Sequence, residues 1–167
     1  MSDDNVFMDQ ALSLAREAMV LKEVPVGAVV VHQGVIIARA HNRRELDQDP
    51  AGHAEFLAMR LAAKRLGSWR LEGCTVYVTL EPCAMCAGAM VLARIDRCVY
   101  GCSDPKAGFM GSLGNLSQHP QLNHRFPVTA GVRAHECGQV LKDFFRNIRA
   151  AKKRAKQRKR LKTDETP

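Results

Sequence analysis

The sequence has no apolar run approaching the roughly 20 residues of a membrane-spanning helix, which argues against a membrane protein. Its N-terminus is acidic and lacks the basic and apolar regions of a secretory signal. There is no internal repeat and no low-complexity region outside the basic C-terminus. For 167 residues that are 46% hydrophobic, we therefore expect one compact domain with a substantial core, located in the cytoplasm.

A disulfide framework is not expected either. Six cysteines could form three disulfides, but a chain of this length and hydrophobic content does not need covalent cross-links. Four cysteines lie among apolar or strand-like neighbours, and we expect them to be reduced, mostly buried thiols. They are Cys74, Cys98, Cys102 and Cys137. The remaining pair, Cys83 and Cys86, is free for other chemistry.

Basic residues gather near the C-terminus. The net charge is +8, and residues 146–162 contain ten Lys and Arg and no Asp or Glu. Of the 25 basic residues, 15 then remain against 17 acidic ones, so the rest of the chain is formally −2. Such a segment suits a polyanion such as nucleic acid, or it simply keeps the protein in solution. We predict a domain at 1–149 and a basic tail at 150–167.

Hydrophobic periodicity predicts alternating helices and strands. The predicted helices cover 5–22, 52–66 and 83–93, and a last helix carries an apolar face from 132 to 148. The predicted strands cover 26–31, 35–40, 74–79, 97–100 and 128–130. The first two strands form a hairpin whose near-continuous apolar pattern indicates burial on both faces. The alternation that follows predicts an α/β protein with a mixed sheet between helices.

Two of the predicted helices should begin at the same edge of the sheet. Consecutive strand–helix units place the helix starts near His53 and Cys83 together, at the edge where open α/β sheets bind ligands. These residues can therefore meet, although they are 30 positions apart. The stretch 104–125, rich in Gly, Asn, Ser, His and Pro, is long for a simple connection, and we expect it to be functional.

Metal ligands are supplied by two short motifs, His53-Ala54-Glu55 and Pro82-Cys83-Ala84-Met85-Cys86. Cys83 and Cys86 are three positions apart at a helix start, so both sulfurs can reach one ion, and the helix dipole lowers their pKa. A His/Cys/Cys set favours zinc, and three protein ligands leave the fourth tetrahedral position for water, as in catalytic sites. Glu55 would then carry protons rather than bind the metal.

Each motif alone has a plainer interpretation. A Cys-x-x-Cys pair is common as a structural or redox pair, and a lone His-x-Glu carries little information. A structural zinc site needs a fourth ligand. The sequence offers Cys74, Cys98, Cys102 and His119 for that position. A structural site leaves Glu55 without a role, so the two motifs together favour a catalytic site.

With several further motifs, the chain resembles the bacterial tRNA-specific adenosine deaminases of the cytidine deaminase superfamily. The resemblance spans about residues 7–149. It is carried by Val24-Pro25-Val26-Gly27-Ala28-Val29, His53-Ala54-Glu55, Leu80 to Ala89, Asp104-Pro105-Lys106, Asn123-His124 and Asp143-Phe144-Phe145-Arg146. It implies hydrolytic conversion of adenosine to inosine at the wobble position of a tRNA anticodon.

The resemblance also implies a structure and a set of roles. The fold would be a three-layer α/β/α sandwich around a mixed five-stranded sheet, cytidine-deaminase-like, in a homodimer whose subunits share substrate contacts. One zinc per subunit would be held by His53, Cys83 and Cys86, with Glu55 as the proton carrier. Asn42 would contact the flipped nucleoside. The anticodon loop would be contacted by Asp104, Lys106, His119, Asn123 and Arg146.

The chain departs from the family's usual pattern at positions near the expected pocket. It has Ala51-Gly52 before the histidine, where the family usually has Thr-Ala, and Phe56 after the glutamate. Phe109-Met110 replace small residues in the long polar stretch. Two alternative functions are therefore carried forward. One is a deaminase of a free nucleobase or nucleotide, such as cytosine or guanine, and the other is a non-catalytic, zinc-stabilised RNA-binding module.

Overall fold

Five strands form one mixed sheet in the computed structural model, which describes residues 3–164, with side chains up to Lys159. Residues 165–167 of the predicted tail lie outside the described residues. The strands are β1 (Gly27–His32), β2 (Val35–His41), β3 (Cys74–Leu80), β4 (Arg97–Cys102) and β5 (Val128–Ala130). Their order is β2-β1-β3-β4-β5, with β1 antiparallel to both neighbours and β3, β4 and β5 parallel.

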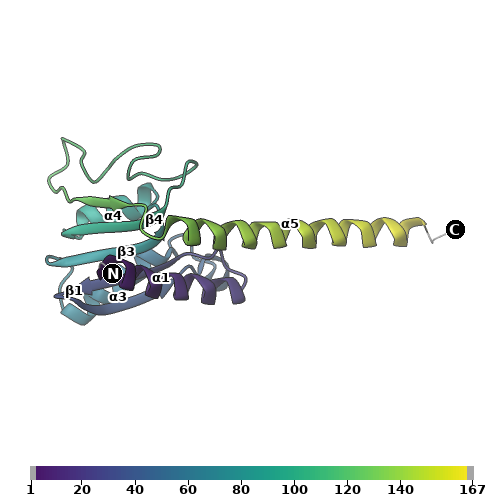
Figure 1. The fold of residues 1–167 in the computed structure, drawn as a ribbon, viewed down its shortest axis with the longest axis horizontal. Helices are drawn as coiled ribbons and strands as arrows, with labels where there is room; N and C mark the ends of the chain where they lie inside the picture. The colour runs from purple at the N-terminus through teal and green to yellow at the C-terminus, as the bar shows by residue number, and fades with distance from the viewer. Residues whose placement is uncertain (1–2, 165–167) are drawn as a thin grey trace.

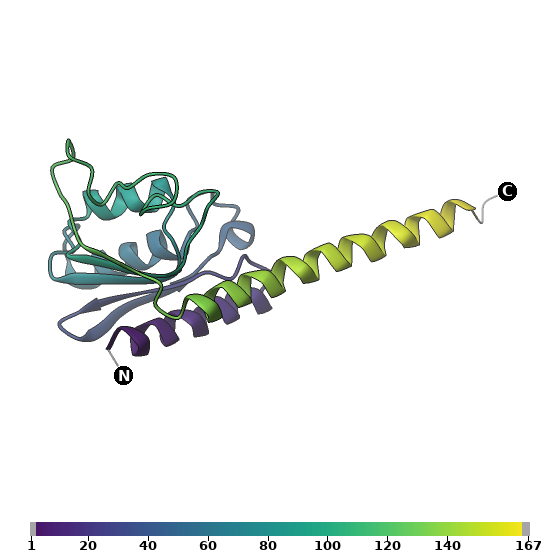
Figure 2. The same cartoon turned by 45° about the horizontal axis from the view of Figure 1, so that its top comes forward.

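Helices cover both faces of this sheet (Figure 1). They are α1 (Asp3–Val20), α2 (Arg44–Asp47), α3 (Ala54–Leu66), α4 (Ala84–Leu92) and α5 (Ala134–Asp164). On one face, Met8 and Leu12 of α1 and Cys137 of α5 share a hydrophobic cluster with the sheet, and α3 and α4 build a separate cluster on the other face (Figure 2). The predicted three-layer α/β/α sandwich with a mixed five-stranded sheet is confirmed.

The interior strand β1, between β2 and β3, is buried on both faces, as its apolar sequence predicts. Val29 and Val31 belong to the cluster under α1, whereas Ala28 and Val30 belong to the cluster under α3 and α4. The same prediction is wrong for β2, where Val35 is 59% exposed. The physical reason is that β2 is an edge strand, so its apolar residues have fewer neighbours to cover them.

The strand directions bring the starts of two helices together. β2 runs opposite to β1, and β1 runs opposite to β3, so β2, β3 and β4 all point the same way. α3 follows β2 and α4 follows β3, so both helices begin at the edge formed by the carboxyl ends of these strands. The predicted convergence at this edge is confirmed, and it positions the candidate site.

Local differences from the predicted elements have simple causes. The short helix α2 lies between β2 and α3, where no helix is predicted, because four residues are too few for a periodic pattern. α3 begins at Ala54 rather than near Gly52, because His53 has an extended backbone. α5 continues without a break past residue 149 and extends away from the body (Figure 1). None of the helices among the described residues is long and apolar enough to cross a membrane.

Candidate metal centre and substrate pocket

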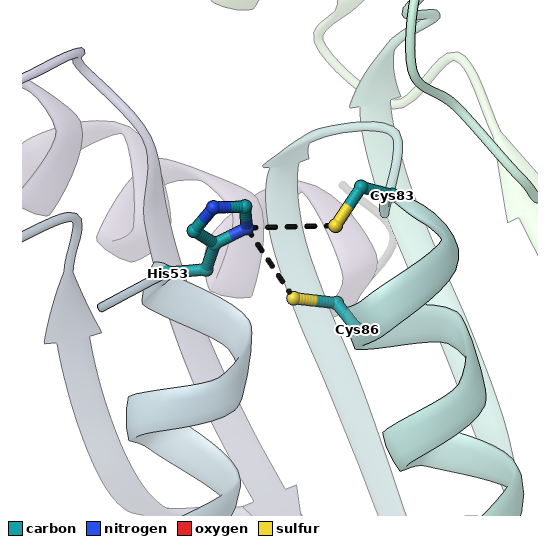
Figure 3. Close-up of side chains that lie close together, drawn as sticks. All are labelled: His53, Cys83 and Cys86. Carbon is teal, nitrogen blue, oxygen red and sulfur yellow. Dashed lines mark hydrogen bonds between the residues drawn. The ribbon is translucent and has the colours of Figure 1, made fainter. Parts of the chain in front are cut away.

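The two motifs predicted to bind a metal lie at the starts of neighbouring helices. His53 is the N-cap residue of α3, and Cys83 is the N-cap residue of α4. Cys86 lies in the first turn of α4, and its sulfur points toward the same place as the other two side chains (Figure 3). Segments far apart in the sequence therefore present three ligand side chains to one point.

The ligand atoms have the spacing of a zinc site. Nδ1 of His53 is 3.5 Å from Sγ of Cys83 and 3.6 Å from Sγ of Cys86 (Figure 3). All three ligand atoms lie within 4.8 Å of one another. A tetrahedral zinc, with bonds of about 2.1 Å to nitrogen and about 2.3 Å to sulfur, separates these two atoms by about 3.6 Å. The donor set and its geometry therefore fit one zinc ion.

Among the described residues, no fourth histidine, cysteine or carboxylate joins this group. All six cysteines are free, as expected from the sequence, and Cys74 and Cys98 are buried in the core. The thiol of Cys102 donates to the carbonyl oxygen of Thr79. Nδ1 of His119 accepts from the backbone N–H of Gln121. The group thus leaves one tetrahedral position open, as catalytic zinc sites do.

The protonation of the three ligand side chains is linked. A hydrogen bond from the Cys86 side chain lowers the pKa of the Cys83 thiol to about 4 against the effect of burial, and His53 lowers it further. The same contact with Cys83, together with burial, raises the pKa of Cys86. The hydrogen bond with Cys83 also raises the pKa of His53. The three ligands therefore share protons that a bound metal would displace.

Glu55 lies beside this group but is not part of it. It sits in the first turn of α3 and is only 4% exposed. Burial raises the pKa of its carboxyl to about 7. A carboxyl that can be protonated or ionised near neutral pH suits a residue that must both take up and release a proton.

A cavity of about 190 Å³ opens next to the ligand group. His53, Cys83 and Glu55 line it, together with Asn42 and Asp104. Its walls also include Val24, Val26, Arg44, Leu80, Glu81 and Ala107. Two of the residues predicted to contact substrate, Asn42 and Asp104, thus share a pocket with the metal ligands and Glu55.

Neighbouring groups fix the positions of these two pocket residues. Nδ2 of Asn42 donates to Oε2 of the buried Glu23 over 2.9 Å, so the side-chain oxygen of Asn42 is the atom available to accept from a ligand. Oδ1 of Asp104 accepts from the backbone N–H groups of Lys106 and Ala107 and shapes a turn. Lys106 is exposed at this turn.

The other three predicted contacts lie away from the pocket. Among the described residues that line the cavity, His119, Asn123 and Arg146 are missing. Oδ1 of Asn123 accepts from Arg94 over 2.8 Å, just beyond the C-terminal end of α4, whereas the ligands lie at the opposite end. Arg146 is on α5 and forms an exposed ion pair with Asp143. These residues could reach only parts of a substrate that extend outside the pocket.

Two glutamates at the site had no role in the sequence analysis. Glu23 and Glu81 are both fully buried, and each is held by hydrogen bonds rather than by a basic side chain. A usable sequence signal existed, because each is a charged residue that stands next to an apolar run and close to a proline. Buried carboxylates require partners, and these partners include backbone N–H groups, which leave no trace in the sequence.

Comparison with known proteins assigns this fold and site to a class. The family model for MafB19-like deaminases matches residues 1–149, so the fold and the site define a deaminase. The tRNA-specific adenosine deaminase of Bacillus subtilis (strain 168) is 51% identical over 157 residues, which are 94% of this chain and 98% of the relative. The chain therefore belongs to the family of tRNA-specific adenosine deaminases, as its motifs predict.

Solved structures give the same result. A structure from work on A-to-I editing by tRNA:A34 deaminases at the wobble position of transfer RNA is 43% identical, with a TM-score of 0.79. It covers 81% of this chain and 99% of that chain. A guanine deaminase from Bacillus subtilis is 39% identical, but covers 59% of this chain and 63% of that chain with a TM-score of 0.57. Both the sequence identity and the share of each chain that is matched are thus higher for the tRNA deaminase than for this guanine deaminase.

Proposed function

We propose that the protein converts adenosine to inosine by hydrolysis at the wobble position of a tRNA anticodon. The observation that carries this proposal is that the buried Glu55 shares one pocket with a three-ligand group that fits zinc. Membership of the tRNA-specific adenosine deaminase family supports the choice of reaction and substrate. The fit of the ligand group supports one zinc ion per chain.

Each residue of the pocket has a separate task in this reaction. His53, Cys83 and Cys86 would hold zinc, which when bound supplies a Lewis acid that lowers the pKa of a water molecule. Glu55 takes a proton from the attacking water, delivers it to N1 of the adenine ring, and passes a further proton to the departing amine. The water oxygen bonds to C6 as ammonia leaves, so adenosine and water become inosine and ammonia.

The pocket suits a single nucleoside that has left its base stack. Its volume of about 190 Å³ suits a single flipped base rather than a stack of bases. We propose that the side-chain oxygen of Asn42 accepts from this nucleoside, because Glu23 holds the amide with its nitrogen turned away. Asp104 and Lys106 stand at the rim and are proposed to contact the neighbouring nucleotides, with Lys106 facing phosphate.

A second copy of the chain is the proposed partner of the outer face of α3 and α4. This face carries a mostly apolar groove of about 280 Å³, formed by Phe56, Met59, Trp69 and Leu92 together with Arg60, Leu71 and three alanines. Trp69 is 62% exposed and Leu92 is 70% exposed, so the groove leaves a large apolar area in water. We propose that a homodimer through this face also brings loop residues of one subunit, Asn123 among them, close to the pocket of the other.

The dimer proposal accounts for the distant position of Asn123 and can be tested at the groove. Leu92→Glu places a charge in the middle of the apolar face and should give a monomer in analytical ultracentrifugation. Val35→Glu is a matched control, because Val35 is similarly exposed but lies on the edge strand β2. Dimers that survive Leu92→Glu as well as Val35→Glu would refute this interface.

The C-terminal segment extends the proposed RNA contact. We propose that 1–149 forms the deaminase domain and that 150–167 acts as a basic arm for RNA, in a cytoplasmic enzyme whose six cysteines are all free thiols. Residues 151–159 are exposed on all sides of α5 and include six Lys and Arg. Arg146 lies just before this arm, and His119 lies on the long loop; both are proposed to contact nucleotides outside the pocket.

Substrate choice is tested by measuring ammonia and inosine with matched substrates. The purified enzyme is given the tRNA anticodon stem-loop, free adenosine, cytosine or guanine, each at the same concentration. We expect ammonia only from the stem-loop, with inosine at the wobble position in stoichiometric amount. Ammonia from guanine or cytosine, and none from the stem-loop, would favour the free-base deaminase. RNA binding without any turnover would favour the binding module.

A further inference from the structure

The segment that follows β4 folds around one buried carboxylate. Glu81 is 2% exposed and stands between Leu80, which ends β3, and Pro82-Cys83, which begins the ligand helix. Its backbone N–H donates to the carbonyl oxygen of Cys102 over 2.9 Å, which fixes its position at the edge of the sheet. The side chain therefore leaves the sheet directly beside a metal ligand.

Four hydrogen bonds converge on this carboxylate. Oε1 accepts from the backbone N–H of Met110 at 3.0 Å and of Ser112 at 2.9 Å. Oε2 accepts from the backbone N–H of Asp104 at 2.9 Å and from the hydroxyl of Ser112. All four donors belong to residues 104–112. The carboxylate thus supplies the hydrogen-bond acceptors that the carbonyl groups of a neighbouring strand would supply to a regular segment.

Close packing confirms how tightly the segment surrounds Glu81. A Cβ atom at Gly108 would lie 2.3–2.6 Å from the carboxyl carbon and oxygens of Glu81, so a larger residue there would displace this carboxylate from its place. The backbone N–H of Phe109 donates to the carbonyl oxygen of Pro82 over 2.9 Å, and Gly108 pairs with Cys83 as an isolated bridge. The segment is therefore attached both to Glu81 and to the residues that lead into α4.

These bonds exclude other roles for Glu81. An ionised carboxylate offers about four acceptor positions, and all four are used by the loop donors. No position is left for a metal ion or for a substrate proton. Glu81 is also not among the described side chains that form the metal-binding group.

We infer that Glu81 is a positioning residue, which holds residues 104–112 against Cys83 and so forms the substrate-side wall of the pocket before RNA binds. The wall residues Asp104 and Ala107 both belong to this segment. Without the carboxylate, residues 104–112 adopt this conformation in only a fraction of the molecules. The apparent affinity for RNA is then reduced in proportion to that fraction. The expected effect on RNA binding rests on the proposed function, whereas the statement that Glu81 fixes the conformation of residues 104–112 does not.

Glu81→Gln tests this role with the smallest change of shape. The amide replaces one acceptor oxygen by a donor group, so at least one backbone N–H of the loop loses its partner. We expect KM for the stem-loop to rise roughly tenfold, because one unsatisfied buried N–H costs about that factor. We expect kcat to change by less than about threefold and zinc to stay at one per chain, because the ligands are untouched.

Hydrogen exchange gives a readout that does not depend on activity. In Glu81→Gln the amides of residues 104–112 should exchange at least roughly tenfold faster, while those of β3 and α4 keep their rates. Glu72→Gln makes the same chemical change at an exposed site and should match the wild type in both measurements. Ser112→Ala removes only the hydroxyl donor and should fall between the two.

Two outcomes would overturn the inference. Loss of zinc in proportion to kcat, with KM unchanged, would mean that Glu81 supports Cys83 rather than the loop. Wild-type exchange and wild-type KM in Glu81→Gln would mean that the four hydrogen bonds do not hold the segment. A wild-type enzyme that forms no inosine would instead refute the proposed function, and the exchange comparison would still decide whether Glu81 holds the loop.

Discussion

His53 and Cys83 are equivalent residues of two helices: each is the N-cap, and Nδ1 of the first lies 3.5 Å from Sγ of the second. An N-cap side chain usually bonds to the first turn of its own helix, but neither of these two does so. Both are therefore available as ligands. The positive ends of α3 and α4 also point at the same place, where they favour thiolate over thiol.

Glu55→Gln tests the proton carrier. It keeps the shape of the side chain but cannot take up or release a proton, so inosine formation should fall by roughly 10²–10⁴. Zinc content and stem-loop affinity should stay at wild-type values, because Glu55 is neither a ligand nor on the rim of the pocket. The rate of inosine formation is measured in single-turnover experiments, the zinc content by metal analysis, and the stem-loop affinity by a binding titration.

The exposed Glu17→Gln on α1 controls for the chemical change itself and should keep full activity. Substantial inosine formation by Glu55→Gln would remove Glu55 from the mechanism. Loss of zinc in the variant would show that its carboxylate supports the metal group instead.

The order of the elements and the ligand group could be predicted from the sequence because both depend on local patterns. The spacing of apolar residues predicts β1 and α1. The two motifs predict the candidate ligands, because a fold of alternating strands and helices brings the starts of the helices to one edge of the sheet. The exposure of Val35 could not be predicted in the same way. It depends on β2 being at the edge of the sheet, which is a property of strand order and not of any one segment.

The rest of the site was hidden for a different reason. Glu81 is bound mainly by backbone N–H groups of residues 104–112, and every residue but proline has such a group, so no side-chain pattern marks the partners. The positions of Asn123 and Arg146 follow from the path of the long loop and of α5. A resemblance can assign such residues to substrate, but only the fold shows that they lie outside the pocket that holds Glu55.

Removal of zinc from His53, Cys83 and Cys86 should destabilise the folded protein. When a chelator removes zinc, His53, Cys83 and Cys86 lose the cation that compensates for placing three ionisable groups close together. The melting temperature of the protein should therefore fall, and it should rise to its original value when zinc is added back. Cys86→Ala should reduce zinc from one per chain to near zero and make the melting temperature insensitive to chelator. Cys74→Ala, equally buried but outside the group, should keep its zinc. Equal zinc content in both variants would contradict the assignment of Cys86.

The pair formed by Asp4 and Arg97 should make stability depend on pH. Two guanidinium nitrogens of Arg97 donate to the Asp4 carboxylate at 2.9 and 2.8 Å, and this hydrogen bonding lowers the pKa of Asp4 against the effect of burial. A lowered pKa in the folded state means that the stabilisation is complete above the unfolded pKa of about 3.9. It is then lost as the pH falls through the lower, folded pKa.

Asp4→Asn should therefore destabilise the protein by about 1 kcal/mol at pH 7 and by progressively less below about pH 4. Urea unfolding of the variant and the wild type between pH 3 and pH 7 measures this difference. Asp47→Asn breaks a more exposed pair with Arg43 and should have a smaller effect at every pH. If Asp4→Asn lowers the free energy of unfolding equally at pH 3 and pH 7, the charge of Asp4 does not contribute to stability.

Truncation after Arg149 tests the basic arm. It removes eight of the 25 basic residues, all of them beyond the part of α5 that packs on the sheet. Each phosphate contact contributes about 0.7–0.9 to the slope of log affinity against log salt. The truncated enzyme should therefore bind the stem-loop more weakly at low salt and with a flatter slope, and the two enzymes should converge in affinity at high salt.

The matched variant keeps the helix and removes only charge. Replacing Lys152, Lys153, Lys156 and Lys159 by Gln should flatten the slope in the same direction as truncation, because the effect comes from released counterions and not from helix length. The binding affinity for free adenosine, which has no phosphate, should respond to neither change. If the slope is unchanged in both variants, the arm serves solubility, and the RNA contacts must come from other parts of the protein, such as the loop 104–125.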